Sequence, residues 1–79
     1  MSAEANILRA CLGLYGVDIL ESEADVASDY TPREALMLLL ADREISARFD
    51  SAHSRPPSDD DVDELLDMYF AIEAKRARA

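Results

Sequence analysis

The sequence predicts a single all-α domain, spanning residues 1–79, of about four helices packed around a central apolar helix at about residues 32–41. Three observations support this. Only two glycines and three prolines occur in 79 residues, which leaves little material for turns and favours few, long elements. Large aliphatic residues recur at spacings of three and four, the period of an amphipathic helix. The hydrophobic content of 49% favours a folded core over disorder.

The first helix is expected over residues 2–15. Ser2 is a suitable N-cap, and Gly16 can adopt the left-handed conformation that commonly follows a helix. The large apolar side chains between them fall on one helical face. They are Ile7, Leu8, Cys11, Leu12 and Tyr15.

The next segment has a weaker pattern. A turn is expected to bring Val17, Ile19 and Leu20 into the core, because a lone strand would find no partner in this chain. Ser22 begins a sequence that resembles a capping box. It predicts a short helix over about residues 23–28.

The central helix has the clearest start. Thr31 can cap it, Pro32 suits its first turn, and Glu34 lies three residues after the cap. Every residue from Leu36 to Leu40 is large and apolar. A helix that is apolar all round must be enclosed by other elements, so we expect the rest of the chain to surround this one.

A break is expected near residues 41–43, because Asp42 can cap a further helix. A single continuous helix is the alternative, since apolar residues on both sides of the break share one face. Either way the helical segment should end by Ser54, because Pro56 and Pro57 cannot continue it.

The last helix is expected to begin at Ser58. Residues 59–61 are all aspartate and suit the first turn, while Lys75, Arg76 and Arg78 suit the C-terminal end. Between them lies a broad apolar stripe. It consists of Val62, Leu65, Leu66, Tyr69, Phe70 and Ile72.

The residues that carry metal or catalytic chemistry are few. Asp59, Asp61 and Asp63 have the spacing of a calcium loop, but the glycine and glutamate that such a loop requires are replaced by Glu64 and Phe70. One cysteine and one histidine are too few for a zinc site. We therefore expect no metal, no cofactor and no catalytic residues, and a protein that is not an enzyme.

Two isolated reactive side chains have structural interpretations. Cys11 falls on the apolar face of the first helix, where a cysteine usually packs without reacting. His53 precedes the proline turn, where an imidazole suits the C-terminus of a helix.

The net charge is −9, from 17 acidic and 8 basic residues. This balance argues against direct nucleic-acid binding and against anionic membranes, and it fits a basic protein partner. The longest apolar run has seven residues, at 35–41, whereas a membrane span needs about 20. A single cysteine and an acidic N-terminus without a signal-peptide pattern predict a cytoplasmic protein.

The candidate binding surface lies on the last helix. Tyr69 and Phe70 are adjacent and so point in different directions; one is expected in the core and the other at the surface. The apolar stripe has two interpretations: a wide core only, or a core together with a docking patch for a protein partner or a second copy. The candidate residues are Met68, Tyr69, Phe70 and Ile72, with Asp59, Asp60, Asp61 and Asp63 as an acidic rim.

Residues 36–70 resemble the helical cap of the haloacid dehalogenase superfamily, and within it the phosphonoacetaldehyde hydrolase family. The resemblance rests on LLLADREISARF at 38–49 and AHSRPPSDDDVDEL at 52–65. It implies a cap-like helical packing. The family's nucleophilic aspartate and magnesium site belong to a core domain for which this chain has no room. Its cap lysine should fall near residues 31–33, but the only lysine is Lys75, so no catalytic residue carries over.

Three hypotheses about function follow. The first is a small, acidic, non-catalytic protein-binding domain with an adaptor or regulatory role, whose partner is a basic protein or a second copy. The second is an acidic mimic of nucleic acid that inhibits a bacterial defence nuclease, as phage-encoded anti-CRISPR proteins do. The third is a detached cap or accessory subunit of a haloacid dehalogenase-type enzyme.

Overall fold

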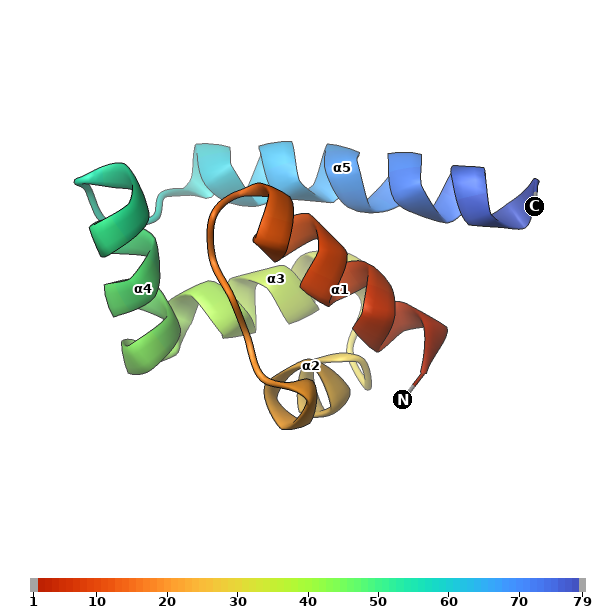
Figure 1. Cartoon of the computed structure of the whole chain (residues 1–79), viewed down its shortest axis with the longest axis horizontal. Helices are drawn as coiled ribbons and strands as arrows, with labels where there is room; N and C mark the ends of the chain where they lie inside the picture. The colour runs from red at the N-terminus through yellow and green to blue at the C-terminus, as the bar shows by residue number, and fades with distance from the viewer. Residues whose placement is uncertain (1, 79) are drawn as a thin grey trace.

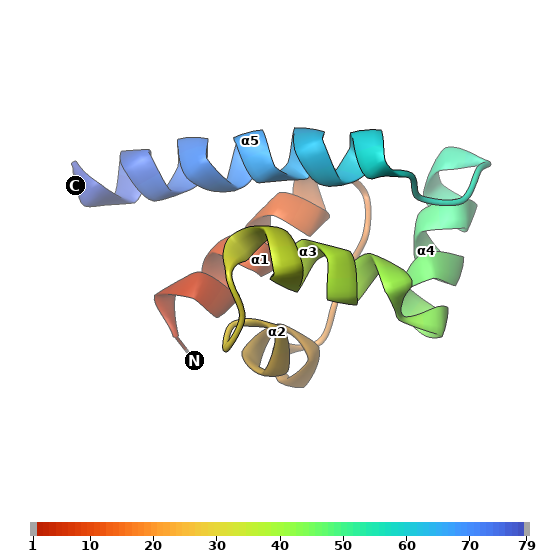
Figure 2. The same ribbon diagram turned by 180° about the vertical axis from the view of Figure 1, so that it is seen from behind.

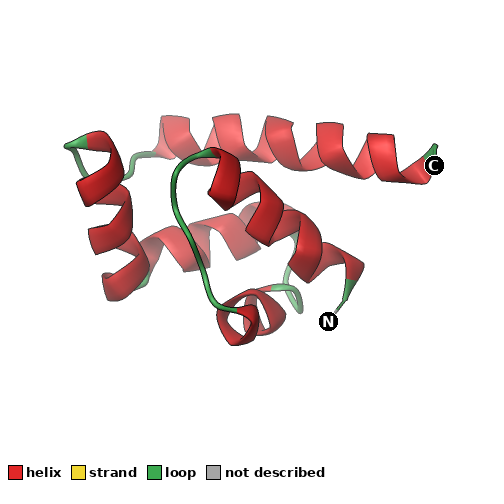
Figure 3. Ribbon diagram, in the orientation of Figure 1, coloured by secondary structure: helices red, strands yellow, loops and turns green. Residues whose placement is uncertain are grey.

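The capping signals of the sequence delimit most of the helices in the computed structural model, which describes residues 2–78 (Figures 1 and 3). The described chain is helical, without strands. Its elements are α1 (Ala3–Leu14), α2 (Glu21–Ala27), α3 (Pro32–Ala41), α4 (Arg43–His53) and α5 (Asp59–Ala77). The all-α prediction is confirmed.

The expected break after α3 occurs at Asp42, and it brings the count to five helices among the described residues. Asp42 has extended backbone angles and therefore ends α3. Its carboxylate accepts hydrogen bonds from the backbone N–H groups of Glu44 and Ile45, so it also caps α4. One residue thus turns the chain between two helices.

The start of α2 differs from the prediction. Leu20, not Ser22, is the N-cap residue, and its backbone N–H donates to the Glu23 carboxylate at 2.7 Å. Val17 and Ile19 are buried as expected, but Leu20 is 60% exposed. The turn before them closes at Gly16, whose φ of +83° is a conformation that glycine adopts without strain.

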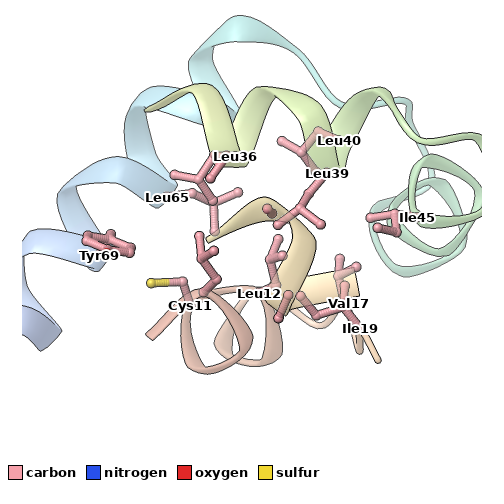
Figure 4. Packing of buried hydrophobic residues seen from close by; sticks show 14 of the residues in the cluster. Cys11, Leu12, Val17, Ile19, Leu36, Leu39, Leu40, Ile45, Leu65 and Tyr69 are labelled. Carbon is pink, nitrogen blue, oxygen red and sulfur yellow. The ribbon is translucent and has the colours of Figure 1, made fainter. Parts of the chain in front are cut away.

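All five helices of the described chain contribute side chains to the core. α5 packs against α1 and α3 on one side, and α2 packs against α1 and α3 on the other. α4 continues from α3 at one end of the molecule (Figures 1 and 2). Figure 4 shows the leucines of α3 directed towards α1 and α5. The main core side chains are Leu8, Leu12, Val17, Leu36, Ile45, Phe49, Leu65 and Tyr69.

The expectation that α3 is enclosed on all sides is wrong. Leu36, Leu39 and Leu40 are buried, but Met37 and Leu38 are 48% and 47% exposed. α3 packs against α2, α4 and α5, and these neighbours leave a strip of its surface uncovered. An apolar run within a helix therefore did not require burial of every residue in it.

Candidate functional site

The structure separates the predicted site residues of α5 into three groups. Tyr69 is 1% exposed and Asp61 is 2% exposed, so neither can form part of a docking surface. Met68 and Ile72 are partly buried against the core. The exposed members are Phe70, Asp59, Asp60 and Asp63.

Asp61 belongs to a closed hydrogen-bond network instead of an acidic rim. The two terminal nitrogens of Arg55 donate to its two carboxylate oxygens, each at 2.7 Å. The hydroxyl of Tyr15 and the backbone N–H of Ser58 also donate to it at 2.7 Å. The Arg55 guanidinium lowers the pKa of Asp61 well below its usual range, with help from Tyr15 and Ser58, so the buried carboxylate is ionised.

An aromatic stack lies beside this network. The ring of Phe49 stacks on Tyr15 and on His53, with centroids 5.7 and 4.3 Å apart, and the Arg55 guanidinium lies 5.3 Å from the centroid of the Phe49 ring. His53 Nε2 lies 2.7 Å from the carbonyl oxygen of Tyr15. A carbonyl only accepts, so Nε2 carries the hydrogen and caps the end of α1.

These contacts form a clasp, which we define as Tyr15, Phe49, His53, Arg55 and Asp61. It joins the C-terminal ends of α1 and α4 to the start of α5. No buried polar side-chain atom among the described residues lacks a hydrogen-bond partner. The clasp has no free buried group to offer a substrate, and we interpret it as structural.

Two further acids of α5 are engaged within the chain. Asp63 pairs with Arg33 of α3 at 2.7 Å, with both side chains exposed. The Tyr15 hydroxyl, whose single hydrogen is shared with Asp61, also lies 2.8 Å from a carboxylate oxygen of Glu64. The acidic start of α5 therefore serves largely to attach this helix to α1 and α3.

The most apolar exposed surface lies between α2 and α3. An open groove of about 440 Å³ has Ala27, Leu39 and Ile45 among its lining, with Val26, Tyr30 and Leu38 beside them. A second hollow of about 370 Å³ shares Tyr30 and Leu38 and extends to Met37 and Ala41. We call the two hollows together the α2–α3 groove.

Four large apolar side chains of this groove are exposed. Val26 is 68% exposed, Tyr30 51%, Met37 48% and Leu38 47%. They account for four of the seven large apolar residues that the described chain exposes. Clustering of this kind marks interaction surfaces more often than scattered single residues do.

Acidic groups border the groove. Glu23 and Asp42 line the first hollow and Glu34 lines the second. Glu23 pairs with Arg48 at 3.0 Å. Asp42 is engaged at the N-cap of α4, and Glu34 accepts from the hydroxyl of Thr31 at 2.7 Å. The segment from Asp18 to Asp29 holds five acids and no base, and two of these acids, Glu21 and Glu23, pair with arginines of other helices.

Other chemistry receives no support from the described residues. Cys11 is buried, and this burial raises the pKa of its thiol to about 11, which makes it a poor nucleophile at neutral pH. Within residues 2–78 no cluster of three or more histidine, cysteine or acidic side chains is arranged to hold a metal ion. None of the described helices combines the length and apolar character needed to cross a bilayer.

The sequence held a partial signal for the groove. Val26 and Tyr30 are four residues apart, and Met37 and Leu38 fall outside the face of α3 that buries Leu36 and Leu39. Helical periodicity could have separated these faces. The clasp was not accessible in this way, because Tyr15 and Asp61 are 46 positions apart.

Comparison of the chain with protein-family models, with curated proteins and with solved structures found no match. The resemblance to a haloacid dehalogenase cap therefore stays a prediction.

Proposed function

We propose that this protein is a non-catalytic protein-binding domain and that its binding surface is the α2–α3 groove. The occupant is a basic amphipathic helix of a partner protein. The observation that carries this proposal is the cluster of exposed apolar side chains, Val26, Tyr30, Met37 and Leu38, bordered by acids. A cytoplasmic location fits the single, unpaired cysteine.

The shape of the groove favours a helix as the ligand. It runs between two helices, and its lining reaches from Ser22 of α2 to Ile45 of α4. Grooves between helices commonly take the apolar face of an amphipathic helix, with side chains at spacings of three and four as anchors. α3 has ten residues, a length of about 15 Å, which matches about three turns of a bound helix.

The charge around the groove favours a basic ligand. Glu23, Glu34 and Asp42 border it, and the whole chain carries a net charge of −9. Complementary charge at the edge of an interface accelerates encounter and disfavours acidic ligands, while the apolar contacts supply most of the affinity. Binding should therefore weaken with salt without being abolished by it.

A binding titration with matched variants tests this proposal. The probe is a fluorescent peptide of about four helical turns, with leucine on one face and lysine on the other. We expect Leu38→Ser to weaken its binding about tenfold, equivalent to about 1.4 kcal/mol. The control is Leu14→Ser, because Leu14 is 73% exposed on α1 and does not line the groove. Its affinity should equal that of the unaltered protein.

Two outcomes contradict the proposal. Equal losses of peptide affinity in Leu38→Ser and Leu14→Ser would mean that the peptide binds without a defined site. If a further variant, Phe70→Ser, is the one that loses affinity for the peptide, the binding surface lies on α5, as the sequence suggested. A second peptide with glutamate in place of lysine should bind more weakly, since the acids around the groove repel it.

The other two hypotheses have less support. A mimic of nucleic acid requires a regular array of free acids, whereas Asp61 is buried and Asp63 is paired with Arg33. The role as an enzyme's accessory cap rests on the sequence resemblance alone.

A further inference from the structure

We propose that the α2–α3 groove also takes the C-terminal end of α5 from a second copy of this chain, so that copies associate head to tail. We call residues 71–78 the α5 tail. This inference rests on the proposed function, because it assumes that the groove accepts a basic helix. It adds a specific occupant, which is present in the chain itself.

The α5 tail is exposed and extends past the body of the molecule. Figures 1 and 2 show α5 continuing beyond α1 towards the C-terminus. Ile72 is partly buried, and the other residues of the tail are exposed. A shallow hollow on the tail is lined by Ala71, Ile72, Ala74, Lys75 and Arg78, so two alanines and the partly buried Ile72 lie next to basic side chains.

The charge of the tail is opposite to that of the groove. It carries Lys75, Arg76 and Arg78 against one acid, Glu73. Among the described residues, none of these three bases forms an ion pair within the chain. Of the five arginines elsewhere, four pair with an acid of the same chain, namely Arg9, Arg33, Arg48 and Arg55. The fifth, Arg43, forms no ion pair among the described residues. The tail is therefore a source of unpaired positive charge on an acidic protein.

The tail lies at one end of the chain's long axis, and α2 and α3, which form most of the groove, lie away from that end (Figures 1 and 2). Asp42 and Ile45 of the groove belong to the junction of α3 and α4, and α4 and the C-terminus occupy opposite ends in Figures 1 and 2. A tail therefore meets the groove of another molecule. A symmetric contact between two grooves is disfavoured, because it would bring two acidic borders together.

The two surfaces are also similar in length. The tail has eight residues, about 12 Å of helix, and α3 along the groove is about 15 Å long. A contact of this size is small, so we expect weak association with a Kd in the micromolar range or above. Such a contact between unlike surfaces extends into open chains or closes into a ring.

A complementation experiment tests this inference with the full chain. The groove variant carries Val26→Ser and Leu38→Ser, and the tail variant carries Lys75→Gln, Arg76→Gln and Arg78→Gln. We expect the unaltered protein to grow beyond a dimer with concentration in sedimentation velocity, and each variant alone to stay monomeric. An equimolar mixture should form a one-to-one dimer and grow no further, because it holds one intact groove and one intact tail for each pair.

The other outcomes overturn the inference. A tail variant that associates as strongly as the unaltered protein would indicate contact between grooves, and a groove variant that does so would indicate contact elsewhere. An unaltered protein that is monomeric up to about 1 mM would exclude head-to-tail contact. If that protein still binds the lysine peptide and Leu38→Ser abolishes the binding, the proposed function stands while this inference fails. Circular dichroism confirms that each variant is folded.

Discussion

The substitution Asp61→Asn tests whether Asp61 stabilises the fold through the clasp, instead of forming part of an acidic surface. The change keeps the size of the side chain and removes its charge. Removing one partner of a buried ion pair costs about 3–5 kcal/mol. Arg55 has a side chain that is 49% exposed and can be solvated again, so we take the lower value, about 3 kcal/mol. A chain of this size has a free energy of unfolding of roughly 4–12 kcal/mol.

Thermal unfolding followed by circular dichroism measures this effect. A loss of about 3 kcal/mol lowers the melting temperature by roughly 12–24 °C in a small domain. Asp63→Asn is the matched control, because Asp63 also lies on α5 and pairs with an arginine at 2.7 Å, but with both side chains exposed. It should cost less than about 1 kcal/mol. Equal effects of the two substitutions would refute the role of the clasp.

The Asp61→Asn variant should also differ from the unaltered protein in how its stability depends on pH. The pKa of Asp61 is lowered in the folded protein, whereas its value in the unfolded chain is about 3.9. The ionised Asp61 carboxylate therefore contributes its full stabilisation of the folded state above the unfolded pKa. This stabilisation is lost as the pH falls towards the folded pKa. The stability advantage of the unaltered protein over Asp61→Asn should shrink below about pH 4. If the difference in free energy of unfolding between the two proteins stays constant down to about pH 2, Asp61 is not an ionised carboxylate in the folded protein.

Two further pairs of substitutions test the packing and the turn. In urea unfolding, Tyr69→Ala should lower the free energy of unfolding by about 3–5 kcal/mol, because Tyr69 is 1% exposed. Phe70→Ala should lower it by less than about 1 kcal/mol, because Phe70 is 48% exposed. Similar losses of stability would mean that Phe70 also supports the core. Gly13→Ala should stabilise α1 by up to about 1 kcal/mol, since nothing lies within 4 Å of the added methyl group. Gly16→Ala should destabilise by about 1 kcal/mol because φ is +83° there, and a gain at Gly16 would contradict the turn geometry.

The elements that the sequence predicted well are those with local signals. Ser2, Thr31 and Asp42 cap helices as expected, since each cap involves residues two or three positions away. The proline turn after Ser54 separates α4 from α5 for a reason that is equally local. These signals were enough to establish an all-helical chain and most of its boundaries.

The predictions that failed depended on contacts between distant parts of the chain. Asp61 has the sequence context of an exposed helix start, but Tyr15 and Arg55 enclose it and supply the donors that a buried carboxylate needs. Met37 and Leu38 have the context of a buried helix, but α2 and α4 do not extend over them. Which face of a helix stays uncovered is decided by tertiary packing, and local composition does not contain that information.

The central claim is that the α2–α3 groove is the binding surface. Chemical-shift mapping of the isotopically labelled protein during titration with the lysine peptide tests it most directly. We predict that the largest amide shifts fall on α2 and α3, around Val26, Tyr30 and Leu38, and saturate with a single Kd. Shifts that fall on Asp59, Asp60 and the exposed acids of α5, or that spread over the surface without saturation, would contradict the claim.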